Sequence, residues 1–301
     1  MREHPVIEVP TLLVAAAIHV GWLGLTWFAG QPWVPGWALV GIAVPGGFLV
    51  AWHGSLQHEI IHGHPTRWGR VNKILASLPI GLWLPFGIYR EQHGAHHRST
   101  RLTCPLDDPE SYYVTAQWWQ SAGAVRRAVA RMQMTAAGRL VLGPPVVVGR
   151  FLREEARAAL KGDRRHARAW AAHMVGVALV IAWLALVCHL SLLWYVACFV
   201  YPGTALTLVR SFAEHRPAEV AAHRIAIVEA GALARLLYLN NNFHAVHHDA
   251  PSVPWYELPE RYAARRDDIV ENNGGFVFRS YRSLLARYAV RPKDSPVHPG
   301  S

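Results

Sequence analysis

The chain has 301 residues, of which 52% are hydrophobic and 17% are charged. Soluble domains usually carry about 25% charged residues, so this composition argues against an ordinary soluble protein. The net charge of +10 could indicate a nucleic-acid-binding protein. We exclude that partner, because eleven basic residues lie between Arg126 and Arg168, directly before a long apolar block. Basic residues in that position suit anionic lipid headgroups, or simply a solvated surface.

Four apolar blocks are long enough to cross a bilayer, which takes about 20 apolar residues. They comprise residues 11–30, 37–57, 169–190 and 191–209. The sequence therefore predicts an all-α integral membrane fold with four transmembrane helices in two hairpins. We expect a single domain over residues 1–301, whose first span is a retained anchor because no small-residue cleavage site follows it.

The basic residues predict the orientation of the spans. Lys and Arg occur at the N-terminus, between Arg67 and Arg168, and from Arg210 onward, but not at the two hairpin tips. The positive-inside rule then places both termini and residues 58–168 and 210–301 in the cytoplasm. We expect an inner membrane of the bacterial type, with a cytoplasmic helical cap.

The segments between the spans are less regular. Residues 70–89 are apolar but interrupted by prolines, as are residues 138–152, and both favour interfacial pieces over spans. Residues 101–113 are a proline-punctuated loop, and residues 148–170 are typical of a helix that breaks at a Gly-Asp pair. The C-terminal RPKDSPVHPGS is expected to be frayed.

Half of the 18 histidines form a pattern. Three motifs, HEIIH, HGAHH and HAVHH, contribute eight of them, and a ninth follows the fourth span alone. Residues at i, i+3 and i+4 share one face of a helix, so each motif can direct two or three imidazoles at one point. The three motifs and the lone histidine predict at least one metal site, with the candidate ligands His58, His62, His93, His96, His97, His215, His244, His247 and His248.

Two other classes of protein remain as alternatives at this point. HEIIH matches the HExxH pattern of zinc peptidases, in which Glu59 would be the general base and one zinc would be bound. That hypothesis leaves most of the six histidines in the other motifs unexplained. A metal transporter or sensor would need polar residues along the spans, which contain mostly isolated histidines and small hydroxyls.

Nine imidazoles exceed the first shell of one ion and suit two. Imidazole binds Fe, Cu, Zn and Ni alike, so the spacing does not select the metal. A redox metal beside a bilayer favours activation of O₂ against a C–H bond of a lipid. A hydrolytic dizinc site would more often include bridging carboxylates, and the motifs contain few.

The set HxxxH, HxxHH and HxxHH, interleaved with two hairpins, resembles the membrane fatty-acid desaturase and hydroxylase family. The stretch NNFHAVHHDAPSVPWYELP is similar to one found in desaturases and in carotenoid ketolases and hydroxylases. The resemblance covers about residues 50–260. It implies an O₂-dependent di-iron oxidoreductase whose two irons are bound by the nine histidines, with acyl-lipid desaturation as the expected reaction and lipid or carotenoid hydroxylation or ketolation as the alternative.

The resemblance also bears on residues near the ligands. His215 occupies the place of a lone histidine ligand in the acyl-CoA desaturases, but Ser211 stands where those enzymes have an asparagine. Asn240 could substitute for it, or cap a helix. Carboxylates that could orient the ligands, and two flanking histidines, are Glu59, Glu91, Asp107, Asp108, Glu214, Asp249, His53 and His64.

No haem-binding or ferredoxin-like segment is visible in the sequence. The electrons are therefore expected from a separate donor of the ferredoxin, rubredoxin or cytochrome type, which a basic cytoplasmic surface would suit if the donor is acidic. The substrate is expected to be a membrane lipid or another acyl compound.

Overall fold

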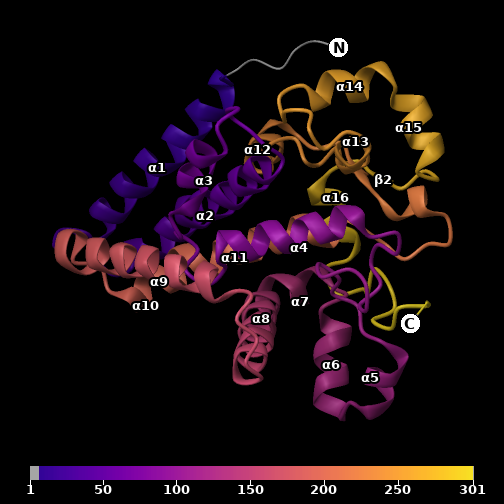
Figure 1. Ribbon diagram of the computed structural model, residues 1–301, viewed down its shortest axis with the longest axis horizontal. Coiled ribbons are helices and arrows are strands. Elements are labelled where there is room, and N and C mark those ends of the chain that lie inside the picture. The colour runs from indigo at the N-terminus through magenta and orange to yellow at the C-terminus, as the bar shows by residue number, and fades with distance from the viewer. Residues whose placement is uncertain (1–6, 301) are drawn as a thin grey trace. The chain divides into compact units, whose positions relative to one another are not determined.

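A computed structural model describes residues 7–300 of the chain (Figure 1). Arg2 and His4, used above for charge and histidine counts, lie outside the described residues. The chain comprises two compact units. Unit 1 contains residues up to 90 and 148–206, and unit 2 contains residues 91–147 and 207 onward. The single-domain organisation stays a prediction.

Unit 1 consists of apolar helices and one short amphipathic helix. Three further helices, α4 (Phe86–Arg98), α8 (Gly143–Leu160) and α11 (Tyr201–Glu214), contain the boundaries between the units. The elements wholly inside unit 1 are α1 (Val9–Ala29), α2 (Ala38–Ile61), α3 (Gly69–Ser77), α9 (Ala167–Ala182), the π-helix η1 (Trp183–Cys188), α10 (Leu192–Tyr195) and the π-helix η2 (Val196–Val200).

Four helical stretches are long and apolar enough to span a membrane: Val9–Ala29, Ala38–Ile61, Ala167–Cys188 and Leu192–Glu214. They confirm the predicted all-α membrane fold, although each of the last two contains a π-helical segment that the sequence pattern did not indicate. α1 packs on α2 and on η1, and α2 packs on η2 (Figure 1).

Polar side chains inside unit 1 bond one another, as the absence of water in a bilayer requires. The indole Nε1 of Trp22 donates to the hydroxyl of Tyr195 over 2.8 Å, and that hydroxyl donates to the carbonyl of Ile80 over 2.6 Å. The indole of Trp183 donates to Thr26 over 3.0 Å. These bonds join α1, η1, α10 and the segment after α3.

Small residues let α2 approach the fourth span closely, as is common between membrane helices. A Cβ atom added at Gly47 would stand 2.7 Å from Pro202, and one at Gly203 would stand 2.5 Å from Val50. Glycine is required at these positions because any larger residue would force the backbones apart.

Unit 2 consists of short helices with one pair of strands. β1 (Ile227–Val228) pairs in parallel with β2 (Val277–Phe278), Ile227 facing Val277. The helices are α5 (Ala116–Ser121), α6 (Ala124–Met132), α7 (Ala136–Val141), the 3₁₀ helix η3 (Ala221–Arg224), α12 (Ala232–Leu237), α13 (His244–Asp249), α14 (Leu258–Ala264), α15 (Arg266–Asn272) and α16 (Tyr281–Arg287).

The core of unit 2 supports α13. Ile227, Phe243, Val246, Leu258 and Tyr262 form one buried apolar cluster, which fixes the helix against β1 and α14. Burial of such side chains stabilises the fold by roughly 1.5–3 kcal/mol each, so α13 has a rigid base.

The prediction that the C-terminal residues are frayed is wrong. The amide of Lys293 donates to the carbonyl of Met134, and the amide of Val114 donates to the carbonyl of Pro296. The amide of His298 in turn donates to the carbonyl of Val114. These bonds attach the C-terminal segment to the loop after α4 and to the turn between α6 and α7, a long-range pairing that local sequence could not reveal.

The predicted loop and the predicted break in the helix of residues 148–170 agree with the structure, and the interfacial position of residues 70–89 and 138–152 stays a prediction. Residues 101–113 form turns, and α8 and α9 end and begin on either side of Gly162 and Asp163. Residues 70–89 contain α3, a series of turns and the start of α4, and no spanning helix.

Candidate metal centre

α4 directs the three histidines of HGAHH to one side. His93, His96 and His97 are spaced i, i+3 and i+4 on this helix, and His93 and His96 are each only 1% exposed. An imidazole buried to this degree needs a partner for each ring nitrogen. The helix therefore presents three side chains that must bond inside unit 2.

α13 directs the histidines of HAVHH in the same way. His244 and His247 are buried, and His248 is half-buried. The short helix follows a turn in which Leu239 and Asn240 have left-handed backbone angles, φ 46° and 55°. Asparagine tolerates this conformation better than most residues, which explains part of the NNN sequence before the helix.

Four histidines of unit 2 form group A: His96, His215, His244 and His248. One ligand nitrogen from each lies within 4.8 Å of all the others. The Nε2 atoms of His244 and His215 are 3.0 Å apart, and those of His248 and His244 are 3.1 Å apart. Metal–nitrogen bonds of about 2.0–2.1 Å place adjacent ligands at about these separations, so the group has the dimensions of one metal site.

Three more histidines of unit 2 form group B: His93, His97 and His247. The Nε2 of His97 lies 3.1 Å from that of His93 and 3.2 Å from that of His247. Group B therefore offers three converging nitrogens, with the same spacing as group A.

Carboxylates of the loop after α4 hold two of these rings by Nδ1. His93 donates to Glu110 over 2.8 Å, and His96 donates to Asp108 over 2.9 Å. Metal-binding histidines typically have such a partner, which fixes the tautomer and leaves Nε2 to the metal. The Nε2 of His96 is buried and bonds no protein atom among residues 7–300, as a nitrogen awaiting a metal would.

His244 is held by an asparagine, and the carboxylate of Glu214 also lies 3.4 Å from its Nδ1. Its Nδ1 donates to the amide oxygen of Asn241 over 3.1 Å. The amide nitrogen of Asn241 donates to Glu214 over 2.9 Å, and Arg210 pairs with Glu214 at 3.0 Å. The Asn241 side chain thus bridges the imidazole and Glu214, with its amide oxygen toward His244 and its amide nitrogen toward Glu214. Arg210 thus orients His244 through two intermediaries.

The facing imidazoles of His244 and His215 are the strongest sign of a cation. His215 donates its Nδ1–H to the carbonyl of Arg224 over 3.3 Å. Burial lowers the pKa of both His215 and His244 well below the usual value, so both rings are neutral. Each then turns a bare Nε2 lone pair toward the other at 3.0 Å. Two lone pairs at this distance repel, and a cation between them converts the repulsion into two bonds.

The charges around group A differ from ring to ring. Burial lowers the pKa of His248, reinforced by the neighbouring histidines. Burial also acts to lower the pKa of His96, but Glu110 and Asp108 outweigh it and raise this pKa to about 9. The carboxylates make His96 the most basic ring of the group, and a metal ion would take the place of its proton.

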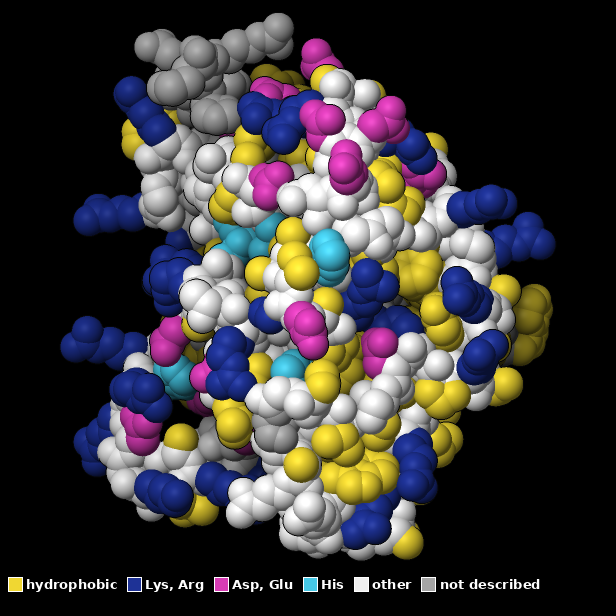
Figure 2. Space-filling model, turned by 90° about the vertical axis from the view of Figure 1, so that its right-hand side faces the viewer, with side chains coloured by type: hydrophobic (Ala, Val, Ile, Leu, Met, Phe, Trp, Pro, Cys, Tyr) yellow, Lys and Arg dark blue, Asp and Glu magenta, His cyan; other side chains and the backbone are white. Residues whose placement is uncertain are grey.

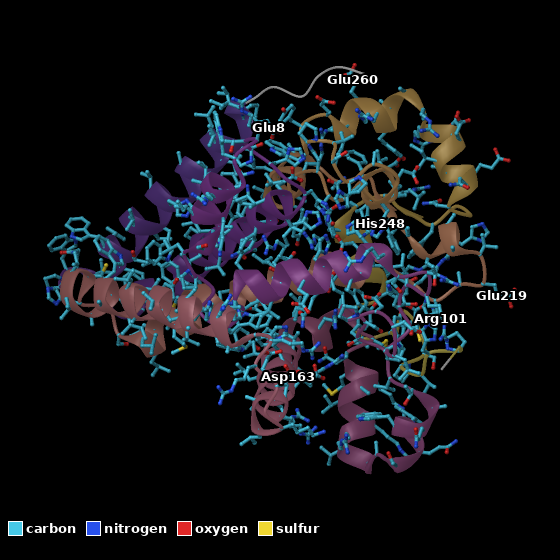
Figure 3. The ribbon with its side chains drawn as sticks, in the orientation of Figure 1. Glu8, Arg101, Asp163, Glu219, His248 and Glu260 are labelled. Atoms are coloured by element: carbon cyan, nitrogen blue, oxygen red, sulfur yellow. The ribbon has the colours of Figure 1, made fainter. Side chains whose placement is uncertain are left out.

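Five of the seven rings in groups A and B are buried, and the other two, His97 and His248, are half-buried. On the face shown in Figure 2, histidine side chains reach the surface in only a few small places. Figure 3 shows His248 among inward-pointing side chains of unit 2, whereas Glu219 and Glu260 point outward at its edge. Low polarity and little water strengthen electrostatic interactions inside such a site.

His58 and His62 belong to unit 1. They lie at the end of α2, with ring centroids 5.0 Å apart, and His58 is buried. The i, i+4 spacing brings the two rings together on one side of the helix, as predicted.

Several sequence-based suggestions for supporting residues are wrong. Asn240 is not a helix cap: it donates to the carbonyl of Trp255 and accepts from Arg235, and its neighbour Asn241 holds the histidine instead. Ser211 accepts a hydrogen bond from Arg139 over 2.8 Å. The turn before α13 shifts the functional asparagine by one residue, which spacing alone could not reveal.

Some of the carboxylates proposed to orient the ligands do so, and others do not. Asp108 and Glu214 support ligands as proposed, but Asp107 pairs with Arg101 near the surface, and Asp249 is exposed. Glu110 was not among the sequence candidates. Its position in the sequence could have indicated this role, since Glu110 follows Asp108 by two residues in the same loop.

Isolated histidines of unit 1 serve helix packing. His173 bonds the carbonyl of Leu82 over 2.8 Å, and His64 pairs with Glu8. His53 contacts the ring of His19 edge-on. These contacts give His173 a role in helix packing and account for His64 without a metal.

The fold and the site together define an integral membrane protein with buried groups of histidines able to hold metal. The family model for fatty acid desaturases matches residues 32–280, which is most of the chain. The chain therefore belongs to the fatty acid desaturase family, whose members are generally oxidoreductases and typically use iron. A search of curated proteins gave no match.

Proposed function

We propose that the protein is an O₂-dependent di-iron desaturase of an acyl lipid. The overall reaction would convert –CH₂–CH₂– and O₂, with two electrons and two protons, into –CH=CH– and two molecules of water. The observation that carries the proposal is the convergence of seven Nε2-bearing rings into groups A and B, within a chain of the fatty acid desaturase family.

In this proposal His96, His215, His244 and His248 hold one iron. The second iron is held by His93, His97 and His247 together with His58 and His62. The inclusion of His58 and His62 rests on the sequence, since HxxxH is the first of the three motifs. Iron held by these nine residues would supply the activation of O₂ against a C–H bond.

The protein's own groups prepare the site for this chemistry. Asp108, Glu110 and Asn241 hold three rings with Nε2 directed inward, which removes the cost of ordering them when metal binds. Burial of the imidazoles keeps water from the reacting centre and protects it from side reactions.

The electrons would come from a separate protein of the ferredoxin, rubredoxin or cytochrome type. The proposed location is a bacterial-type inner membrane, with the histidines on the cytoplasmic side. The absence of Lys and Arg from the two hairpin tips supports this orientation.

Two measurements test the proposal: the iron content of the purified chain, and the lipid products of cells that express it. We expect about two irons per chain in the wild type, and lipids lighter by two hydrogens than in cells expressing His97→Ala. His97→Ala and His247→Ala should lose iron and turnover together. Asp107→Asn is the matched control, because Asp107 lies in the loop after α4 and pairs with Arg101 near the surface.

Three outcomes would change the proposal. A product heavier by one oxygen would establish a hydroxylase with the same ligands. Full iron retention in either histidine variant would contradict the ligand set. One zinc per chain and peptide cleavage that depends on Glu59 would replace the proposal by the peptidase alternative.

A further inference from the structure

The turn between α8 and α9, in unit 1, borders a cavity that is open to the surface and that the proposed chemistry does not use. Its volume is about 660 Å³, which is within the usual range for ligand sites. The lining is largely apolar, from Leu152, Ala156, Ala159 and Trp170, with Arg164 and Arg165 beside them. Asp163, labelled in Figure 3, marks this turn. The cavity therefore combines an apolar wall with two guanidinium groups, and Glu155, Asp163 and His166 complete its polar lining.

The acidic side chains of this hairpin are all engaged. Glu155 accepts from His166 Nδ1 and from the indole of Trp170, each over 2.9 Å. Asp163 pairs with Arg165 at 2.7 Å, and Glu154 pairs with Arg150 at 3.0 Å. None of the three carboxylates is left to neutralise a further cation.

The basic side chains outnumber the acidic ones, seven to three, over residues 150–168. Five of the seven form no ion pair with any residue of the described chain, and all five are exposed. They are Arg153, Arg157, Lys161, Arg164 and Arg168. The hairpin thus has a strong excess of positive charge. Of these five basic residues, Arg164 is the one that lines the cavity.

The cavity also lies at the start of the third candidate span, where lipid headgroups are expected. The third candidate span begins at Ala167, and Trp170 stands in its first turn. Tryptophan is enriched at this depth, where its ring is apolar and its N–H meets polar groups. The anionic leaflet surface attracts basic residues that adjoin a span.

We propose that this cavity binds an anionic phospholipid, with the headgroup phosphate at Arg164 and Arg165 and an acyl segment against Leu152, Ala156, Ala159 and Trp170. The excess charge selects an anionic headgroup, and the apolar wall selects a lipid over a soluble anion. An acidic protein would satisfy the charge but would not fill a cavity lined by alanines. The inference does not rest on the proposed catalytic function.

Native mass spectrometry of the delipidated full-length chain in detergent tests the site, with phosphatidylglycerol and phosphatidylcholine as probes. We expect one phosphatidylglycerol to bind at least tenfold more tightly than phosphatidylcholine. Arg164→Gln combined with Arg165→Gln should weaken phosphatidylglycerol binding about 20- to 30-fold, from about fivefold for each basic residue near an anionic headgroup. The matched control, Arg153→Gln with Arg157→Gln, removes the same charge away from the cavity and should weaken binding less than threefold.

A second pair of variants tests the cavity itself without altering charge. Ala156→Trp fills it and should abolish specific binding, whereas Ala128→Trp, on the exposed side of α6, should not. Retained iron content and helical circular dichroism show that each variant is folded. Equal losses in the two arginine pairs, undiminished binding to Ala156→Trp, or displacement of the lipid by millimolar glycerol phosphate would each overturn the proposal. So would binding of polyglutamate in preference to phosphatidylglycerol.

Discussion

Replacing Asp108 by asparagine removes one charge from beneath group A while preserving the shape of the side chain. The wild-type carboxylate is buried and accepts three N–H groups: Nδ1 of His96 at 2.9 Å, the amide of Glu110 at 3.0 Å and the amide of Thr103 at 2.9 Å. Asparagine has one oxygen, and its amide nitrogen is itself a donor. At least one of the three N–H groups must therefore lose its acceptor.

The cost of Asp108→Asn follows from this arrangement. A buried donor without an acceptor costs about 1–3 kcal/mol, and more when the lost bond involved a charge. Loss of a residue that orients a metal ligand typically lowers metal affinity 10- to 100-fold. That range corresponds to about 1.4–2.7 kcal/mol of binding free energy, in the same range as the hydrogen-bond estimate.

Iron retention against a graded series of chelator concentrations measures the effect. Asp108→Asn should release one of two irons at a chelator concentration 10- to 100-fold below that needed for the wild type, and the other iron later. Asp107→Asn is the control, because Asp107 pairs with Arg101 where both side chains are about half exposed, and such pairs contribute 0–1 kcal/mol. If Asp108→Asn held both irons as firmly as Asp107→Asn, the proposed role of Asp108 would be refuted.

Three more substitutions test other parts of the structure. Lys293→Met removes a buried ammonium that donates to the carbonyl of His215 over 2.6 Å. The variant should unfold at a temperature several degrees lower and bind one iron less tightly. An unchanged unfolding temperature in a thermal scan would contradict this. Gly47→Ala should destabilise the membrane helices by about 1–3 kcal/mol, because its Cβ would stand 2.7 Å from a proline, whereas Gly41→Ala meets nothing within 4 Å and should be neutral in the same scan. His62→Ala should remove one of two irons and leave the other, so loss of both in a metal assay would show that the irons are not held separately.

The membrane helices and the ligand candidates could be predicted because both depend on local pattern. A run of about 20 apolar residues spans a bilayer whatever its neighbours are. Likewise, the i, i+3, i+4 spacing of HGAHH puts its histidines on one side of a helix before any tertiary contact is known. The length of the apolar runs predicts the spans, and the helix period predicts the shared face of the histidines, so both could be predicted from the sequence.

The residues that support the ligands could not be predicted in the same way. Whether Asp107 or Asp108 reaches His96 depends on the turn of the loop after α4, and one step along the chain exchanges a buried acceptor for an exposed one. Asn240 and Asn241 differ likewise, because left-handed backbone angles before α13 rotate the second toward His244. Turn geometry at single-residue precision is decided by tertiary contacts.

The attachment of the C-terminal segment bears on the order of events during synthesis. Val114 exchanges backbone bonds with Pro296 and His298, and the hydroxyl of Tyr113 donates to Asp294 over 2.7 Å. The loop that holds Asp108 and Glu110 is therefore secured by residues translated almost two hundred positions later. While the ribosome is still producing those residues, α4 and its histidines already exist without this support. If the proposed metal centre forms, its stable loading would then wait until translation is nearly finished, and metal acquisition would be a late step.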